Sequence, residues 1–440
     1  PAFLSGSEGT LAVLVGATVR LVQPPAARAL AVVPYTDVDQ ALAAVPGLLD
    51  TGPSAIELMD AALVDPANRQ PRERALLSLV HSASAMLVVE YSGEAGDVRE
   101  RAAAIPGASV IADPADQAAI WTIRRTGIAR ALRAEGDAKP IPFIEDPAVP
   151  PDRLAAFARE VRALLGDEDM GDAVWYGHAS VGCLHIRPMV DLRATGAAER
   201  VRRVAEGVAD LVHAHGGSLS GEHGDGRLRG ELLPRMYDPS MIERFAQAKH
   251  ALDPRGILNP GVIVDPDPMD EGFRIAASPP LRHIGTDVSF DHAGGLQRAV
   301  EACNGNGQCR RSDAVMCPSY QALRDERHST RGRAVLLRAA IEGRLDLGLA
   351  DPGLHEALDL CLSCRACATE CPAGVDMSRL KVEALVQRHV EHRPSAASLA
   401  AAHAHDLMRA GSASPRLARR MARVAERRLV LDRGLRRHVD

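Results

Sequence analysis

Four cysteines lie close together in the segment CLSCRACATECP, where Cys361, Cys364, Cys367 and Cys371 are separated by two, two and three residues and followed by a proline. An iron–sulfur cluster needs three thiolates from one tight loop and a fourth from elsewhere in the fold, and this spacing supplies the three. Zinc and a disulfide knot are the alternatives, but zinc sites usually pair two CxxC units some distance apart. The spacing therefore favours an iron–sulfur cluster.

A second cysteine run lies upstream in CNGNGQCRRSDAVMCPSY. Two [4Fe–4S] clusters need eight thiolates, and the two runs together provide seven. In the crossed arrangement, the cysteine before each proline ligates the other cluster. One cluster then takes Cys317, Cys361, Cys364 and Cys367, and the other takes Cys303, Cys309 and Cys371. Asn306 stands where the missing ligand would be, so we expect the second cluster to be [3Fe–4S] or a [4Fe–4S] cluster with a non-cysteine ligand.

Histidines and an acid form another set of residues that can do chemistry. GHASVGCLHIRP places His178 and His185 seven residues apart around a glycine-containing turn, and SGEHGDGRLRG adds Glu222 and His223. Two imidazoles and a carboxylate suit Zn²⁺, Mn²⁺ or Fe²⁺. Taken singly, each histidine fits a structural role better than a metal-binding one, and Glu-His between glycines also fits a plain turn. The spacing alone leaves these alternatives open.

Composition excludes several classes of protein. The chain of 440 residues is long enough for two or three domains, and its net charge of −5 argues against a general nucleic-acid binder. Aromatic residues make up only 3%, too few for platforms that stack single-stranded bases. The apolar run LAVLVGATVRLV is shorter than a membrane span and is broken by Arg20. We expect a cytoplasmic protein without membrane insertion, able to dock peripherally at the inner face of a membrane.

The elements that must position these residues follow an α+β pattern. Strand-like runs such as ALAVVPYT, AMLVVEYS, KPIPFIED, AVWYGHAS and CLHIRPMV alternate with helical stretches such as DVDQALAAVPGLLD and PDRLAAFAREVRALLG. Further on, helices such as TRGRAVLLRAAIEG and DMSRLKVEALVQRHV alternate with the cysteine runs. The predicted divisions are a short segment with an apolar strand (1–26), an α+β domain (27–265), a Pro/Asp-rich linker (266–289), a helical cysteine domain (290–395) and an Arg-rich helical tail (396–440). The tail fits a solvated helix or one that packs on a further domain.

Several long motifs, in this order, resemble the FAD-linked oxidases of the vanillyl-alcohol-oxidase superfamily. They are SGSEGTLAVLVGATVRLV, GHASVGCLH, SGEHGDGRL, LDPRGILNPG, MCPSY, RHSTRGRA and CLSCRACATECP. The match is to the D-lactate and D-2-hydroxyglutarate dehydrogenase type with a fused Fe–S module. The resemblance implies a ferredoxin-like α+β catalytic domain followed by an α-helical ferredoxin-type domain. It also implies a missing N-terminal FAD-binding domain, of which 1–26 is the end, and a further C-terminal domain.

The resemblance also assigns roles to individual residues. It implies a divalent metal held by His178, His185 and Glu222, with His223 as the catalytic base. It implies that Arg124 and Lys139 bind substrate carboxylates, and that Ser7, Glu8, Gly9 and Thr10 contact FAD. The motif departs from the family at Ser180, Val181 and Cys183, where Gly, Asp and Asn are more usual. Cys183 is interpreted as a buried thiol, with a spare metal ligand as the alternative.

The implied activity is oxidation of a D-2-hydroxy acid, D-lactate or D-2-hydroxyglutarate, to the 2-oxo acid. FAD takes the hydride, and the clusters pass the electrons to a quinone, a cytochrome or another carrier. One alternative is the Fe–S electron-transfer subunit of a glycolate-oxidase-like complex, and another is a metal-binding structural protein. The metal set and the two cations favour the dehydrogenase, because an electron carrier needs neither. With most of the FAD pocket absent, we expect this stretch alone to bind FAD weakly or not at all and to be inactive.

Overall fold

The computed structural model of the protein describes residues 3–64, 71–80, 83–131, 136–271, 284–313 and 315–391, with 403–414 and the single positions 394, 399, 416 and 419. Its chain divides into two compact units. The first comprises residues 1–284, 290–316 and 366–375, and the second comprises residues 285–289, 317–365 and 376–440, each within the limits of the described residues. No helix in these ranges is both long enough and apolar enough to cross a bilayer.

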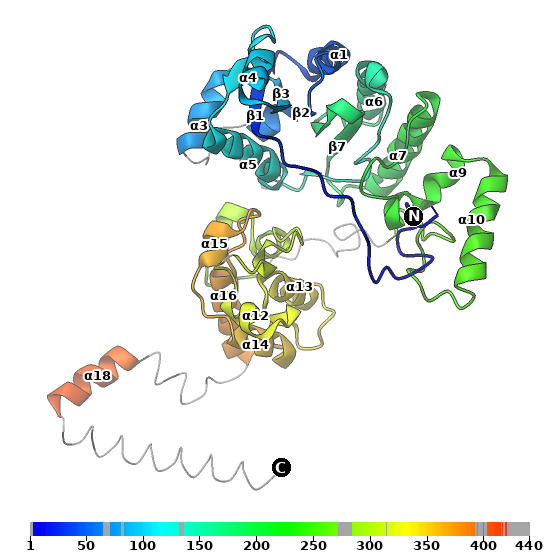
Figure 1. The fold of residues 1–440 in the computed structure, drawn as a ribbon. Coiled ribbons are helices and arrows are strands. Elements are labelled where there is room, and N and C mark those ends of the chain that lie inside the picture. The colour runs from blue at the N-terminus through cyan, green and yellow to red at the C-terminus, as the bar shows by residue number, and fades with distance from the viewer. Residues whose placement is uncertain are drawn as a thin grey trace. The chain divides into compact units, whose positions relative to one another are not determined.

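The first unit is built on an antiparallel sheet of seven strands in the order β4-β1-β3-β2-β6-β7-β5 (Figure 1). The strands are β1 (Ala27–Tyr35), β2 (Ala55–Asp60), β3 (Ala85–Gly93), β4 (Ser109–Ile111), β5 (Lys139–Pro140), β6 (Ala173–His178) and β7 (Cys183–Val190). Its helices are α1 (Val38–Leu49), α2 (Ala61–Val64), α3 (Pro71–Leu77), α4 (Ala95–Ala103), α5 (Pro114–Ala131), α6 (Leu154–Asp167), α7 (Ala197–Ala214), α8 (Gly226–Arg229), α9 (Leu233–Met236), α10 (Pro239–Leu252), α11 (Leu296–Glu301) and α15 (Ala366–Glu370).

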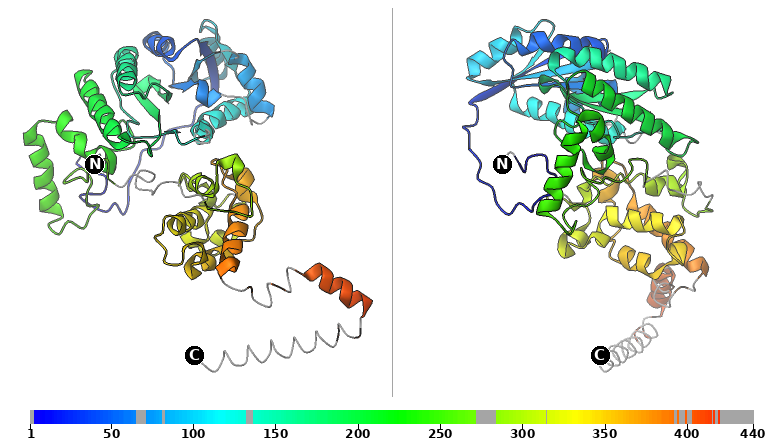
Figure 2. Two further views of the ribbon diagram at one scale, coloured as in Figure 1. Left: turned by 180° about the vertical axis from the view of Figure 1, so that it is seen from behind. Right: turned by 90° about the vertical axis from the view of Figure 1, so that its right-hand side faces the viewer.

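Both faces of this sheet carry a core, because successive side chains of a strand point to opposite sides. On β1, Ala29 and Ala31 belong to the cluster that α1, α4, α6 and α7 complete. The intervening Leu30 and Val32 belong to the cluster that α2, α3 and α5 complete. Figure 2 shows helices on both sides of the sheet. We call the side of α2, α3 and α5 the second face, since the residues of the candidate site lie on it.

Most of the predicted strands and helices are confirmed. ALAVVPYT, AMLVVEYS, AVWYGHAS and CLHIRPMV correspond to β1, β3, β6 and β7. In KPIPFIED only the first two residues are in a strand, β5. The predicted strand in residues 11–22 is wrong: the segment is coil, and Val15 is 98% exposed. A strand needs a neighbour for its backbone hydrogen bonds, and no described strand pairs with this segment.

The second unit is helical, whereas parts of the predicted helical cysteine domain (290–395), residues 290–316 and 366–375, belong to the first unit. Its helices are α12 (Pro318–Leu323), α13 (Thr330–Ile341), α14 (Pro352–Asp359), α16 (Met377–Glu391) and α18 (Ala404–Ala413). The predicted helices TRGRAVLLRAAIEG and DMSRLKVEALVQRHV correspond to α13 and α16. Apart from α18 and a few single positions, the predicted Arg-rich tail (396–440) lies outside the described residues, as does 272–283 of the linker. The observed α+β architecture with a helical second part confirms the predicted fold class.

Candidate metal and substrate site

Strand register places the central residues of the site on one face of the sheet. Glu57 of β2 is the cross-strand neighbour of His178 of β6, and Tyr176 of β6 is the neighbour of His185 of β7. Directly opposite residues of paired strands share a face, so all four side chains lie on the second face. There Tyr176 packs with the α5 core cluster. The polar groups of the site therefore lie on the same face of the sheet as this apolar cluster, next to it.

The turn between β6 and β7 brings the two histidines together, as the sequence predicted. Gly182 has φ +76°, and a Cβ at this position would lie 1.8 Å from the carbonyl oxygen of Val149. Only glycine fits here, because the hairpin turn packs directly on the backbone of the 146–149 loop. The rings of His178 and His185 lie 5.3 Å apart between centroids, nearly perpendicular.

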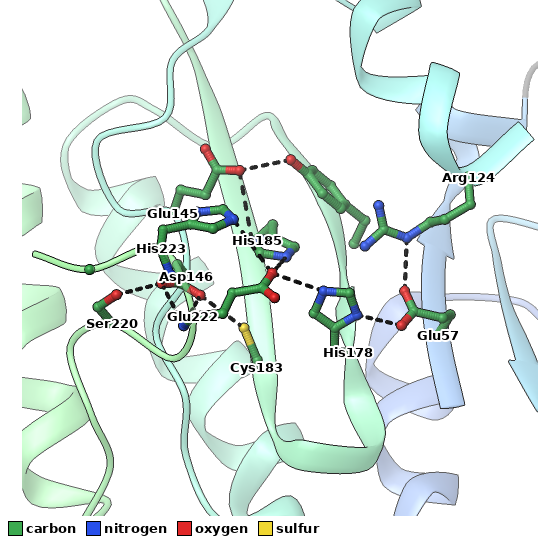
Figure 3. Close-up of polar contacts among 12 residues, drawn as sticks. Glu57, Arg124, Glu145, Asp146, His178, Cys183, His185, Ser220, Glu222 and His223 are labelled. Atoms are coloured by element: carbon green, nitrogen blue, oxygen red, sulfur yellow. Dashed lines mark hydrogen bonds and ion pairs between the residues drawn. The ribbon is translucent and has the colours of Figure 1, made fainter. Parts of the chain in front are cut away.

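Three imidazoles converge on one carboxylate oxygen (Figure 3). Glu222 Oε1 lies 2.9 Å from Nε2 of His178, 3.3 Å from Nε2 of His185 and 3.4 Å from Nε2 of His223. The His185 and His223 rings are stacked, 5.1 Å apart. The structure thus brings together the three predicted metal ligands and the predicted base. Nitrogen and carboxylate donors at this spacing fit a borderline divalent ion such as Zn²⁺, Mn²⁺ or Fe²⁺.

Asp146, which the sequence analysis missed, holds the Glu222 loop in place. It is fully buried, and its carboxylate accepts hydrogen bonds from the backbone N–H groups of Glu222 (3.1 Å) and His223 (2.8 Å) and from the hydroxyl of Ser220 (2.6 Å). Burial alone would raise the pKa of Asp146, but the bonds from Ser220, His223 and Glu222 outweigh it and lower that pKa. An anionic Asp146 therefore fixes the loop that carries two of the predicted site residues.

Asp146 has an unusual backbone conformation, with φ +82°. Its own N–H donates to the carbonyl of Leu184 in β7, and its carbonyl accepts from Gly221 N–H. Positive φ is uncommon outside glycine, and aspartate is among the residues that tolerate it. The conformation lets one residue bond the β6–β7 hairpin with its backbone and the Glu222 loop with its side chain.

Glu57 is a second residue that the sequence analysis missed. Its side chain is 9% exposed; one oxygen bonds Nδ1 of His178, and the other accepts a 2.9 Å hydrogen bond from Nε of Arg124. A carboxylate on the far nitrogen of a histidine fixes the ring orientation and the tautomer, leaving Nε2 for a metal. Glu57 therefore links a predicted metal ligand to a predicted substrate-binding residue.

Two neighbouring imidazoles have opposite pKa shifts. The hydrogen bond with Glu57 raises the pKa of His178 above its ordinary value. Burial, and then the charge of Arg124, lower the pKa of His185 to about 3. Nδ1 of His185 is buried and makes no hydrogen bond with any residue that the structure describes, although Glu145 Oε1 is 3.7 Å away. His185 therefore stays neutral at physiological pH, the form that binds a metal.

Two guanidinium groups stack on the ring of Tyr176. Arg124, from α5, lies 4.7 Å from the ring centroid, and Arg187, from β7, lies 5.7 Å from it. Glu145 accepts hydrogen bonds from the Tyr176 hydroxyl (2.9 Å) and from Arg187 (2.5 Å). Since Glu57 takes only Nε of Arg124, the terminal nitrogens of that guanidinium form the positive side of the site.

Lys139, the other predicted carboxylate ligand, is placed differently. It lies on β5 opposite Val190, whose side chain is in the core cluster of the other face. Burial lowers the pKa of Lys139, while the charge of Asp137 raises it and that of Arg298 lowers it. The register thus directs Lys139 away from the face that carries the histidines.

Cys183 lies beside the histidines and Glu222, and it is the cross-strand neighbour of His178. Its thiol is buried and donates to Asp146 Oδ1 at 3.2 Å. Ligand atoms of Asp146, Cys183, His185 and Glu222 all lie within 4.8 Å of one another, as do those of Glu145, His185 and His223. The spare-ligand interpretation of Cys183 thus remains open beside that of a buried thiol.

The predicted FAD-contacting residues are hydrogen-bonded to the Glu222 loop, which continues through Asp225 and Gly226. Glu8 accepts hydrogen bonds from the backbone N–H groups of Asp225 (2.6 Å) and Gly226 (2.9 Å). Asn259 donates to the Glu8 carbonyl, and the buried Lys249 donates to that of Thr10. The Glu8 side chain is therefore used within the protein. The backbone N–H groups of Glu8 and Gly9 make no hydrogen bond among the described residues, and their contact with FAD stays a prediction.

The predicted cluster ligands differ in exposure. Cys309, Cys317, Cys367 and Cys371 are buried, Cys303 and Cys361 are half-buried, and Cys364 is exposed. Asn306, at the predicted ligand gap, is exposed and caps a turn, since its side-chain oxygen accepts the N–H of Gln308 at 2.9 Å. Seven thiols in two short runs fit iron–sulfur chemistry, because Fe–S clusters are held by cysteine thiolates.

Comparison with known proteins gives two family matches. Residues 24–263 match the FAD linked oxidases, C-terminal domain, and residues 299–375 match the 4Fe-4S dicluster domain. The chain is 28% identical over 447 residues to D-2-hydroxyglutarate dehydrogenase of Escherichia coli, covering 88% of this chain and 44% of that protein. It is 30% identical over 437 residues to the Pseudomonas putida protein of the same name, covering 85% of this chain and 42% of that one.

A third relative matches only the first part of the chain. D-lactate dehydrogenase of Archaeoglobus fulgidus is 29% identical over 265 residues, which cover 59% of this chain and 57% of that protein. The chain thus spans less than half the length of the two D-2-hydroxyglutarate dehydrogenases. The matches confirm the resemblance to oxidases of the vanillyl-alcohol-oxidase type with an Fe–S module. Because the first match covers more than half of its 440 residues, the chain belongs to the FAD-linked oxidases and joins their C-terminal domain to a 4Fe–4S dicluster domain.

Proposed function

We propose that the protein oxidises a D-2-hydroxy acid, D-lactate or D-2-hydroxyglutarate, to the 2-oxo acid and passes the electrons through iron–sulfur clusters to an acceptor. The convergence of three imidazole nitrogens on Glu222, beside the Arg124 guanidinium, supports this proposal most directly. The similar D-2-hydroxyglutarate dehydrogenases and D-lactate dehydrogenase support the substrate class. An electron-transfer subunit without substrate chemistry would need neither group.

In this proposal each residue has one task. His178, His185 and Glu222 hold a divalent ion, and Arg124 binds the substrate carboxylate through its terminal nitrogens. His223 accepts the proton of the 2-hydroxyl, since its ring is 45% exposed and stacks beside His185. When bound, the ion acts as a Lewis acid on the hydroxyl, FAD accepts the hydride and the clusters carry the electrons singly.

A dicarboxylate such as 2-hydroxyglutarate needs a second cation. Lys139 is assigned this task by the family resemblance, but its register directs it to the other face. Arg187 lies on the same face as the histidines and shares the Tyr176 ring with Arg124. We therefore propose Arg187 beside Lys139 as a ligand of the distal carboxylate.

The electron route is the second part of the proposal. One cluster is expected to be [4Fe–4S], and the one at the Asn306 gap [3Fe–4S] or a [4Fe–4S] cluster with another ligand. The acceptor is a quinone, a cytochrome or another carrier. Since the chain spans less than half of its D-2-hydroxyglutarate dehydrogenase relatives, we propose that most of the FAD pocket lies outside these 440 residues.

Kinetics on the full-length enzyme test the proposal. We expect D-lactate or D-2-hydroxyglutarate, and not the L enantiomers, to reduce the bound flavin anaerobically and to reduce an artificial acceptor under turnover. A chelator should abolish the reaction, and the removed metal should restore it. An enzyme that reduces its flavin with neither D acid, although FAD and metal are bound, would contradict the proposal.

A further inference from the structure

Thr330 contacts the sulfur of a predicted cluster ligand twice. The backbone N–H of Thr330 donates to Cys317 Sγ at 3.0 Å, and the Thr330 hydroxyl lies 3.0 Å from the same sulfur. Both residues are buried, with Thr330 2% and Cys317 8% exposed. A cysteine that ligates iron carries no proton on its sulfur, so the hydroxyl must be the donor. Cys317 therefore accepts two hydrogen bonds from one residue.

The local sequence RHSTRGRA explains why Thr330 is held there. Ser329 caps α13 by accepting the N–H of Gly332 at 2.9 Å, which makes Thr330 the first residue of the helix. A Cβ on Gly332 would lie 2.0 Å from the carbonyl oxygen of Glu326, so only glycine lets the helix pack this closely. Arg333 is 1% exposed and donates to the carbonyl of Ala357. The helix start is thus fixed on both sides.

A donor on a ligating sulfur has a predictable effect on a cluster. Reduction adds one negative charge, which the cluster shares with its thiolates. Hydrogen bonds to the sulfurs stabilise that charge, and they are among the features that set the reduction potential of Fe–S clusters. The start of α13 adds the positive end of the helix dipole. Both effects favour the reduced form.

We propose that Thr330 raises the reduction potential of the cluster that Cys317 ligates. The inference rests on the proposed function for the presence of that cluster. The step itself is the uptake of one electron, from the flavin in turnover or from dithionite in a titration. No bond is broken and no proton moves.

Three substitutions at Thr330 separate the two donors. Thr330→Ser keeps both. Thr330→Val keeps the N–H and the shape but removes the hydroxyl. Thr330→Pro removes both, and proline is accepted at the first helical position, where the preceding Ser329 already has the extended conformation that proline requires (φ −84°, ψ 158°). Thr369→Val is the control, because the Thr369 hydroxyl bonds the carbonyl of Ala366 instead of a sulfur.

The measurement is a redox titration of the full-length protein, followed by EPR, with iron counted in each variant. We expect Thr330→Ser and Thr369→Val to leave both midpoints unchanged. In Thr330→Val the midpoint of one cluster should shift to a more negative potential, with its reduced-to-oxidised ratio at fixed potential falling roughly two- to tenfold, the size of one hydrogen bond. Thr330→Pro should shift it further, and the other cluster should not respond.

The crossed arrangement makes a further demand. The shifting signal should be that of the complete [4Fe–4S] cluster and not that of the cluster at the Asn306 gap. An unmoved midpoint in Thr330→Val with full iron content would overturn the inference and leave the proposed function intact. If Thr330→Pro loses iron, Thr330→Val decides alone. A parent protein without iron would contradict the proposed function and this inference together.

Discussion

Glu57 bonds His178 through Nδ1, while Nε2 of the same ring lies 2.9 Å from Glu222 Oε1. Glu57 and His178 are direct cross-strand neighbours, so the register of β2 and β6 brings them together. By bonding Nδ1, Glu57 holds the ring so that Nε2 lies toward the candidate metal position.

Replacing Glu57 with glutamine should weaken metal binding in the full-length enzyme about 10- to 100-fold, the usual effect of losing a carboxylate behind a ligating histidine. A neutral amide no longer fixes the His178 tautomer. Competition with a chromophoric chelator measures the affinity. Glu90→Gln is the control, since Glu90 lies on β3 and pairs with Arg28. Metal affinity within twofold of the parent would assign Glu57 to Arg124 alone.

The ligands and the base should separate by metal content. Alanine at any of His178, His185 or Glu222 should remove metal and activity together, because an open site has three protein ligands. His223→Ala should keep the metal and lose about 10²–10⁴-fold in kcat. Metal analysis beside kinetics distinguishes them. Because Nε2 of His223 is also near Glu222 Oε1, loss of metal in His223→Ala would make it a ligand instead of the base.

The second substrate carboxylate can be assigned by comparing two substrates. A residue that binds it should matter for D-2-hydroxyglutarate and not for D-lactate, which lacks that group. We expect Arg187→Lys to raise KM for D-2-hydroxyglutarate selectively, because lysine keeps the charge beside Glu145 but loses the planar fork. Lys139→Ala is the paired variant. A selective effect in Lys139→Ala, with Arg187→Lys unchanged, would return the role to Lys139.

Retention of FAD should depend on the hydrogen bonds between Glu8 and the Glu222 loop. Glu8→Ala removes the acceptor for the N–H groups of Asp225 and Gly226, so residues 7–10 lose their main side-chain attachment to that loop. We expect a lower ratio of FAD to protein after desalting of the full-length enzyme. Glu94→Ala is the control, since Glu94 precedes α4 without making a capping hydrogen bond. Equal FAD retention in both variants would refute this dependence.

Asp225 should make stability depend on pH. Burial, and then the charge of Glu8, raise the pKa of Asp225 to about 6, and its buried Oδ1 has no hydrogen-bond partner in the described part of the chain. An unfolded aspartate has a pKa of about 3.9, so the folded state binds this proton more tightly. The stabilisation is complete below pH ~4 and is lost as pH rises through about 6.

Asp225→Asn does not titrate, so the variant should gain in Tm over the parent between pH 4.5 and pH 7.5. Thermal unfolding at the two pH values, roughly on either side of the shifted pKa, measures this gain. Asp152→Asn, at an exposed position before α6, should show no such trend. If the difference in Tm between Asp225→Asn and the parent is the same at both pH values, folding does not raise the pKa of Asp225.

The sequence by itself predicted the candidate groups of the two sites. Thiols at short intervals before a proline predict clusters from local spacing alone. His178 and His185 flank a glycine turn, so their meeting across a hairpin is also a local matter. The motif order indicated the FAD-linked oxidase family, which the comparisons confirm. These features depend on neighbours in the chain, and a linear pattern records them.

Only the tertiary structure decided what surrounds the histidines. Glu57 reaches His178 because β2 pairs with β6 across a gap of more than a hundred residues, and no local pattern encodes that strand order. Asp146 bonds the Glu222 loop from a distance of 76 residues in the chain. Register places Arg187 on the face of the histidines and Lys139 on the other face, because successive residues of a strand point to opposite faces of a sheet. Composition and spacing specify which groups are available, whereas pairing of distant backbone segments determines which of them meet.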